Sequence, residues 1–210
     1  MTELYLVRHG ETDWNRQHRI QGLTDIPLNA TGRTQARATG RLLARRTWDG
    51  IYASPLSRAM ETARIIAEEV GLGEPQAIPE LVERNYGDAE GLDFAEVERR
   101  YPDRIDVPGQ ESREAVVARV VPALRALAAQ HPGESLIVVS HGGAIRSVLT
   151  AVDPDYSHGM ITNGSVHSFG LLDDELSLIA FNDPIEVESI GADCEDLDDQ
   201  NAVEAREPVA

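Results

Sequence analysis

Short apolar runs alternate with longer segments of helical periodicity along the first 180 residues of the chain. Residues 3–8 (ELYLVR), 51–53 (IYA) and 136–139 (LIVV) are mainly apolar runs of the kind that form buried strands. Residues 166–172 and 176–181 predict a hairpin around an Asp-Asp-Glu turn. Because strands here alternate with helices, the pattern favours a layered α/β fold.

The segments between these strands carry apolar side chains at helical spacing. Pro55 predicts the first turn of one helix, and Gly71 follows its end. Asp93 and Ser112 are expected to cap two further helices, since each precedes a helical pattern and offers a side-chain oxygen to unpaired N–H groups. The other expected helices span residues 31–46 and 144–150.

Two regions lack this periodicity. Residues 11–30 are polar and rich in turn formers, so they predict a loop between the first strand and the first helix. Residues 183–210 hold ten acidic residues and one arginine, which predicts an acidic, flexible tail, with an interaction or autoinhibitory segment as the alternative. The chain is therefore expected to comprise one domain, residues 1–182, and this tail.

Charge and composition exclude several classes of protein. The net charge of −17 comprises −9 from residues 183–210 (ten acids, one arginine) and hence −8 from the rest, and this acidic balance argues against nucleic-acid binding. All nineteen basic residues are arginine, which excludes Walker-type phosphate sites and lysine Schiff bases. Any bound anion must then be held by arginine, backbone N–H groups or histidine.

Cysteine usage and hydropathy indicate the expected compartment. The single cysteine, Cys194, allows neither an intramolecular disulfide nor a thiolate metal cluster within one chain. No apolar run reaches the length of a membrane span, and the start of the chain lacks a secretion-signal pattern. We therefore expect a cytoplasmic protein that does not bind membranes.

Two predicted strands each end in a histidine followed by glycine, at His9 and His141. In open α/β sheets, the loops at the carboxyl ends of strands line the ligand crevice. Arg8 adds a guanidinium beside His9, and Arg58 lies where the positive end of a predicted helix would reinforce its charge. One such histidine is more often structural and a lone Arg58 more often solvated, but together these residues favour an anion site.

Four segments occur in the order LVRHGETDWN, SPLSRAMETA, ERNYGDAEG and VSHGG. Together they resemble the histidine phosphatase superfamily, in its phosphoglycerate mutase-like group. The resemblance covers about residues 2–180. It implies a three-layer α/β/α sandwich with a mostly parallel central sheet.

The resemblance also implies roles for five residues. His9 matches the nucleophile that becomes a phosphohistidine, and Arg8, Arg58 and His141 match the residues around the phosphate. Glu83 matches the carboxyl group that protonates the leaving oxygen. Chemistry supports these roles, because phosphoryl transfer needs positioning and spread positive charge, and imidazole with a pKa of about 6.5 is a competent neutral nucleophile.

The substrate-binding residues are less sharply indicated. Glu80 competes with Glu83 for the role of acid, and ranks second because the motif spacing favours Glu83. The expected substrate-binding residues are Asn15, Gln21, Gly22, Thr24, Arg84 and Gly142, with Trp14, Tyr86, Glu111 and Asn163 as further rim residues. Nothing in the sequence singles out one substrate.

The resemblance leaves hydrolysis and mutase activity open. The mutases of this group carry a longer, basic segment where residues 91–111 here are short and mixed in charge, so water is expected to reach the phosphohistidine. The expected activity is hydrolysis of a small phosphomonoester without metal or cofactor. The alternatives are a phosphoglycerate mutase that uses 2,3-bisphosphoglycerate, and a non-catalytic protein that binds phosphorylated ligands. The chain is also expected to form a homodimer.

Overall fold

A six-stranded sheet with strand order β3-β2-β4-β1-β5-β6 lies at the centre of the computed structural model, which describes residues 1–102, 107–156 and 159–183. β1, β4, β2 and β3 pair in parallel, whereas β5 is antiparallel to both β1 and β6. The mostly parallel sheet expected from the sequence is confirmed. The strands are β1 (Thr2–Arg8), β2 (Gly50–Ala53), β3 (Gln76–Ala77), β4 (Ser135–Ser140), β5 (Val166–Leu172) and β6 (Glu175–Ala180).

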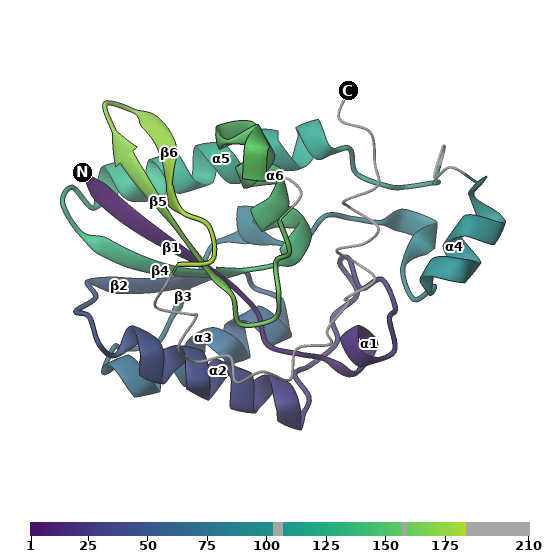
Figure 1. Ribbon diagram of the computed structural model, residues 1–210, viewed down its shortest axis with the longest axis horizontal. Coiled ribbons are helices and arrows are strands. Elements are labelled where there is room, and N and C mark those ends of the chain that lie inside the picture. Colours follow the sequence, from purple (N-terminus) through teal and green to yellow (C-terminus); the bar gives the residue numbers. More distant parts are fainter. Residues whose placement is uncertain (103–106, 157–158, 184–210) are drawn as a thin grey trace.

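Helices cover both faces of this sheet. In Figure 1, α2 and α3 lie below the sheet, and α5 and α6 lie above it. The α-helices are α1 (Asp13–Arg16), α2 (Ala30–Leu43), α3 (Ser57–Val70), α4 (Phe94–Arg100), α5 (Arg113–Gln130) and α6 (Gly142–Val152), and the 3₁₀ helices are η1 (Pro79–Leu81), η2 (Gly87–Ala89) and η4 (Pro154–Tyr156). This arrangement is the three-layer α/β/α sandwich that the family resemblance implied.

β1 is apolar without alternation because it is buried on both faces. Leu4 and Leu6 pack in one hydrophobic cluster with residues of α5 and α6. Tyr5 and Val7 point to the other face and pack with residues of α3. The two clusters hold β1 rigidly, and this fixes where the residues after its carboxyl end are placed.

The element predictions were confirmed for the strands, the hairpin and the long helices, with three differences. α3 begins at Ser57, so the placement of Pro55 in its first turn was wrong; Leu56 keeps an extended backbone as the N-cap. The predicted loop contains α1, and β3 was not predicted, because four and two residues are too short for periodicity to reveal. Asp93 and Ser112 cap α4 and α5 as expected.

The predicted acidic tail lies almost entirely outside the described residues, and so does Cys194. Asp183, its first residue, is buried, and its carboxylate accepts a hydrogen bond from Oγ of Ser168 at 2.9 Å. The backbone N–H of Asp183 donates to the carbonyl oxygen of Val166. The described chain therefore ends attached to β5.

His167 on β5 is a buried histidine that is held neutral. Its Nδ1 accepts a hydrogen bond from the N–H of Asn182 at 3.2 Å, and its Nε2 lies 3.0 Å from Oγ of Ser165. Burial lowers the pKa of His167 to about 3, and Arg146 also lowers it. Native His167 therefore takes up no proton between pH 7.5 and 5, whereas an unfolded histidine does.

Stability is expected to fall as the pH drops through the ordinary histidine range. Between pH 7.5 and 5, protonation of His167 in the unfolded chain lowers the free energy of unfolding by about 2 kcal/mol. Urea unfolding of the wild type and of His167→Gln at several pH values measures this difference. We expect the variant to lose less stability over this range, and equal losses in the two proteins would contradict the assignment.

Candidate active site

Three neighbouring strands end at the same edge of the sheet, and each is followed by a polar residue. His9 follows β1, Ser54 follows β2 and His141 follows β4, and β4 lies between the other two strands. The ring centroids of His9 and His141 are 5.1 Å apart. Nε2 of His141 lies 2.7 Å from Oγ of Ser54. Parallel pairing therefore brings both histidines into one site.

The ring orientation of His9 is fixed by the backbone. Its Nδ1 lies 2.7 Å from the carbonyl oxygen of Gly10, so Nδ1 carries the proton and the lone pair of the neutral ring is on Nε2. Burial lowers the pKa of His9 well below its usual value, and Arg58 and Arg8 lower it further. His9 is therefore neutral at pH 7, with its lone pair on Nε2.

His141 is also fully buried and neutral. Burial lowers its pKa well below the usual value, and the charge of Arg58 adds to this effect. Its Nδ1 is buried and has no hydrogen-bond partner among the described residues. Because a buried polar atom without a partner is costly, this nitrogen is suited to contact a bound ligand.

Arg8 and Arg58 bring two fully buried guanidinium groups to the same site. Nη1 of Arg8 donates to the carbonyl oxygen of Ile161 at 2.7 Å. The two Nη atoms of Arg58 donate to the carbonyl oxygens of Gly22 and Thr24 at 2.8 and 3.0 Å. Burial lowers the pKa of Arg58 to about 10, which leaves it charged at pH 7. Two fixed positive charges beside neutral imidazoles form a site for an anion.

Glu83 lies at the N-terminus of α6, next to this positive site. Its Oε2 accepts a hydrogen bond from the N–H of Gly143 at 3.0 Å, and its Oε1 accepts from those of Ala144 at 3.0 Å and Arg84 at 2.7 Å. The side chain is 1% exposed. The backbone of α6 and the residue after Glu83 thus fix the position of this carboxyl group.

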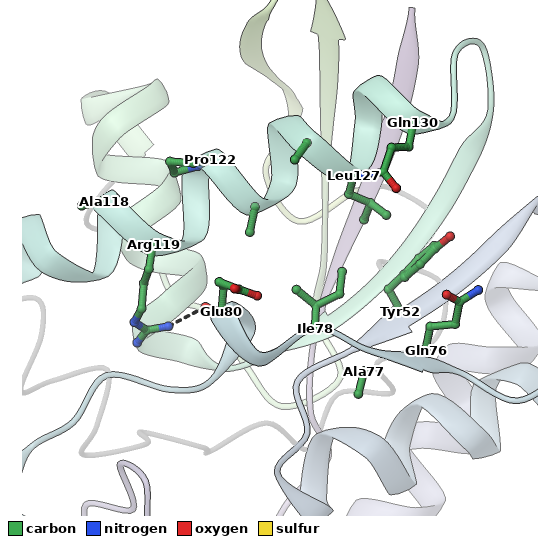
Figure 2. Close-up of a pocket in the computed structure, with 12 residues that line it drawn as sticks. Tyr52, Gln76, Ala77, Ile78, Glu80, Ala118, Arg119, Pro122, Leu127 and Gln130 are labelled. Carbon is green, nitrogen blue, oxygen red and sulfur yellow. Dashed lines mark hydrogen bonds between the residues drawn. The ribbon is translucent and has the colours of Figure 1, made fainter.

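Glu80, the second candidate for the acid, lies elsewhere. It is exposed and lines a cavity of about 550 Å³ between α5 and the strands β2 and β3. Figure 2 shows Arg119 and Leu127 of α5 facing Ile78 and Tyr52 across this cavity. Neither His9, Ser54 nor His141 lines it. Geometry therefore favours Glu83 over Glu80 as a neighbour of the histidines.

The loop of residues 21–24 closes another side of the site. Gln21 is 1% exposed, and neither atom of its amide has a hydrogen-bond partner in the described part of the chain. Gly22 has φ +55°, and a Cβ there would lie 2.0 Å from Oε1 of Glu90. The carboxylate of Glu90 accepts hydrogen bonds from the N–H groups of Leu23 and Thr24, both at 2.9 Å. Glu90 therefore shapes the loop that holds Arg58.

α1 and α6 contribute three further predicted residues. Oδ1 of Asn15 accepts from the N–H of Thr12 at 3.1 Å, so Asn15 belongs to the capping box that opens α1. Trp14, beside it, is half-buried. Gly142 opens α6, and a Cβ there would contact Nε of Arg8 at 3.4 Å. The start of α6 therefore lies directly against the guanidinium of Arg8.

The remaining rim residues, at positions 84–86, 111 and 163, lie on three segments. Arg84 donates through Nε to the carbonyl oxygen of Glu111 at 2.7 Å, and its Cζ lies 5.4 Å from the centre of the Tyr86 ring. Nδ2 of Asn163 donates to the carbonyl oxygen of His9 at 2.9 Å. These expected rim residues are thus held in place by hydrogen bonds and a ring contact near the site.

Sequence reasoning missed Ser54, Glu90 and Arg119. Ser54 is a polar residue directly after a predicted strand, so the signal that singled out the two histidines could have found it. Glu90 and Arg119 act through backbone groups that are distant in the chain, and no sequence pattern reports such contacts.

Replacing Glu90 by alanine is expected to lower kcat/KM about tenfold, because the loop that holds Arg58 loses its hydrogen bonds to the carboxylate. Steady-state kinetics on one phosphomonoester measures this. Asp88→Ala is the matched control, since Asp88 is exposed and lies two residues away. Equal activity of the two variants would contradict this function of Glu90.

Comparison with known proteins identifies the family. The model of the histidine phosphatase superfamily (branch 1) matches residues 4–184. The chain belongs to the histidine phosphatase superfamily. The resemblance seen in the four sequence segments is thereby confirmed. This histidine phosphatase is an enzyme that hydrolyses phosphomonoesters.

Its relatives include phosphatases of bacteria and plants. A Bacillus subtilis protein named "Uncharacterized phosphatase PhoE" is 40% identical over 87% of this chain and 95% of its own length. The "Metal-independent phosphoserine phosphatase" of Arabidopsis thaliana is 34% identical over 91% of this chain and 85% of its own. A mycobacterial glucosyl-3-phosphoglycerate phosphatase, solved with VO3, has a TM-score of 0.77 at 31% identity, covering 86% of this chain and 98% of its own.

Two features of the described residues bear on other classes of site. Residues 1–102, 107–156 and 159–183 contain no helix long and apolar enough to span a bilayer. Within the same ranges, no three histidine, cysteine, aspartate or glutamate side chains are grouped so that they could hold a metal ion.

Proposed function

We propose that this protein hydrolyses small phosphomonoesters through a phosphohistidine formed on Nε2 of His9. The observation that carries the proposal is the neutral, buried His9 next to two buried guanidinium groups. This combination suits attack on a dianionic phosphate, because the nucleophile is unprotonated while the surroundings are positive.

In the first step, Nε2 of His9 attacks phosphorus, the N–P bond forms and the ester P–O bond breaks. The leaving oxygen takes a proton from the carboxyl group of Glu83. The dianionic charge of the bound phosphate offsets the charges of Arg8 and Arg58, which by themselves favour the carboxylate. Protonation lowers the barrier because an alkoxide is a poor leaving group.

In the second step, a water molecule attacks the phosphohistidine. The carboxylate of Glu83 takes a proton from the water, the P–N bond breaks, and inorganic phosphate forms with His9 again neutral. The enzyme ends the cycle in the state in which it began. The net reaction converts an ester and water to an alcohol and phosphate, so no metal or cofactor is needed.

Four groups are assigned to the phosphate itself. Arg8 and Arg58 are placed to balance its charge, and Nδ1 of His141 and the amide of Gln21 are buried atoms that a phosphate oxygen would satisfy. Asn15, Gly22, Thr24, Arg84 and Gly142 are assigned to the surroundings of the phosphate and the substrate rim.

The substrate is proposed to be a small phosphorylated metabolite. Relatives are named for phosphoserine and for glucosyl-3-phosphoglycerate, and both compounds carry a carboxylate besides the phosphate. Arg84, near the site, offers a charge for such a group. The cytoplasmic location and the homodimer remain predictions.

The experiment is phosphate release from a panel of phosphomonoesters, with EDTA in every sample. 3-Phosphoglycerate plus 2,3-bisphosphoglycerate is assayed in parallel for isomerisation. We expect phosphate release, together with a phosphoenzyme that is labile in acid and stable in alkali. Isomerisation without net release would instead establish a mutase, and silence in both assays would favour a protein that only binds phosphorylated ligands.

A further inference from the structure

Arg119 in the middle of α5 uses all five of its N–H donors. Nη1 donates to the carbonyl oxygens of Glu80 and Val82 at 2.6 and 2.8 Å. Nη2 donates to the carbonyl oxygen of Glu83 at 3.0 Å. Its Nε and Nη2 bind the two carboxylate oxygens of Glu111 at 2.8 and 2.9 Å. One guanidinium thus holds three carbonyl groups of the segment that ends in Glu83.

Glu111 extends this contact to the residues after Glu83. Its carboxylate accepts from the N–H of Asn85 at 3.2 Å, and its own N–H donates to the carbonyl oxygen of Asn85 at 2.8 Å. Burial by itself raises the pKa of Glu111, but the hydrogen bonds from Arg119 and Asn85 outweigh it and lower the pKa. The carboxylate of Glu111 therefore stays charged at neutral pH, and Arg119 and Glu111 are named here the clamp.

The clamp holds the backbone of Glu83 through the carbonyl oxygen of that residue. Arg119 lines the cavity between α5 and β2 (Figure 2), in which a dashed line joins it to Glu80. The positive charge of Arg119 also contributes to lowering the pKa of His141, and a lysine at position 119 keeps that charge. α6 holds the carboxyl group of Glu83 and the clamp holds its backbone, so this side chain is constrained at both ends.

We propose that Arg119 is a positioning residue for proton transfer by Glu83, and that it acts selectively on esters whose leaving group needs a proton. This inference rests on the proposed function. A misplaced carboxyl group slows cleavage of an alkyl phosphate, because general acid catalysis depends on hydrogen-bond reach to the leaving oxygen. It does not slow attack by His9 on an ester whose leaving group is already a weak base.

The test compares two esters in the whole enzyme and measures kcat/KM, which reports the steps up to cleavage of the ester bond. Glycerol 2-phosphate has an alkoxide leaving group, whereas 2,4-dinitrophenyl phosphate needs no acid. Arg119→Lys keeps the charge but loses the planar fork, and Arg125→Lys, six residues along the same helix and exposed, is the matched control.

We expect Arg119→Lys to lose about 30-fold on glycerol 2-phosphate and less than about 3-fold on the dinitrophenyl ester. Glu111→Gln should show the same selectivity, so the comparison can still be made with this variant if Arg119→Lys does not fold. Arg125→Lys should match the wild type on both esters.

Equal losses on the two esters would show a merely structural function and overturn the proposal, and so would no loss on either. A wild type that releases phosphate neither from these two esters nor from any ester of the panel would instead contradict the proposed function. The two failures are therefore distinguishable.

Discussion

The His9→Ala protein is expected to release phosphate about 10⁴-fold more slowly than the wild type, or slower still, on every ester it hydrolyses. Nε2 of His9 is the nitrogen with a lone pair in the buried site, since the ring is neutral and its Nδ1 faces the carbonyl oxygen of Gly10. Without it no N–P bond forms. Phosphate release and labelling of the protein quenched in alkali, in which a phosphohistidine survives, measure the loss together.

A matched histidine control separates this effect from general damage. His18 has φ +54° and is exposed, so His18→Asn keeps a residue that tolerates the left-handed backbone and should leave activity unchanged. A His9→Ala protein that kept more than a few per cent of wild-type activity, or that still formed the alkali-stable phosphoenzyme, would contradict the assignment of His9.

Replacing Arg58 by alanine is expected to lower kcat/KM about 10³-fold, because the site loses a preorganised positive charge where negative charge must be balanced. Two further losses follow, since the guanidinium also holds the carbonyl oxygens of Gly22 and Thr24. Arg58→Lys should restore little, as an ammonium cannot reproduce this planar fork. Orthovanadate should also bind more weakly to both variants, so its inhibition constant, measured alongside kcat/KM, should rise.

Arg64→Ala is the control on the same helix. Arg64 is half-exposed and forms a surface ion pair with Glu74 at 2.5 Å. Its loss should therefore change activity less than about twofold. If Arg58→Ala and Arg64→Ala behaved alike, the buried guanidinium would not contribute to phosphate binding, and the proposed distribution of charge in the site would be wrong.

The layered fold could be predicted because its strands are buried on both faces and its helices carry one apolar face. A continuous apolar run such as residues 136–139 is typical of a strand that is buried on both faces. α1 and β3 could not be found, since four and two residues carry no period. The start of α3 was misplaced because Pro55 and the N-cap Leu56 both precede the first helical turn.

The candidate site could be predicted only as far as local patterns reach. His9 and His141 were singled out by their positions after strands, and their 5.1 Å ring separation follows from adjacent parallel strands. Glu83 could be assigned only through the family resemblance, because in sequence a Glu followed by an Arg looks the same whether the pair is exposed or lies in an active site. Arg119 could not be foreseen, since its partners are carbonyl oxygens of a distant segment, and every residue type offers those.

The adjacency of β1 and β4 has a consequence for folding kinetics. Arg8 pairs with Ser140 across most of the chain, so the two histidines meet only after this non-local pairing has formed. Closing so long a loop is slow compared with forming α3 or the β5–β6 hairpin. Recovery of enzymatic turnover during refolding should therefore lag behind recovery of helical circular dichroism, and would time the completion of the sheet.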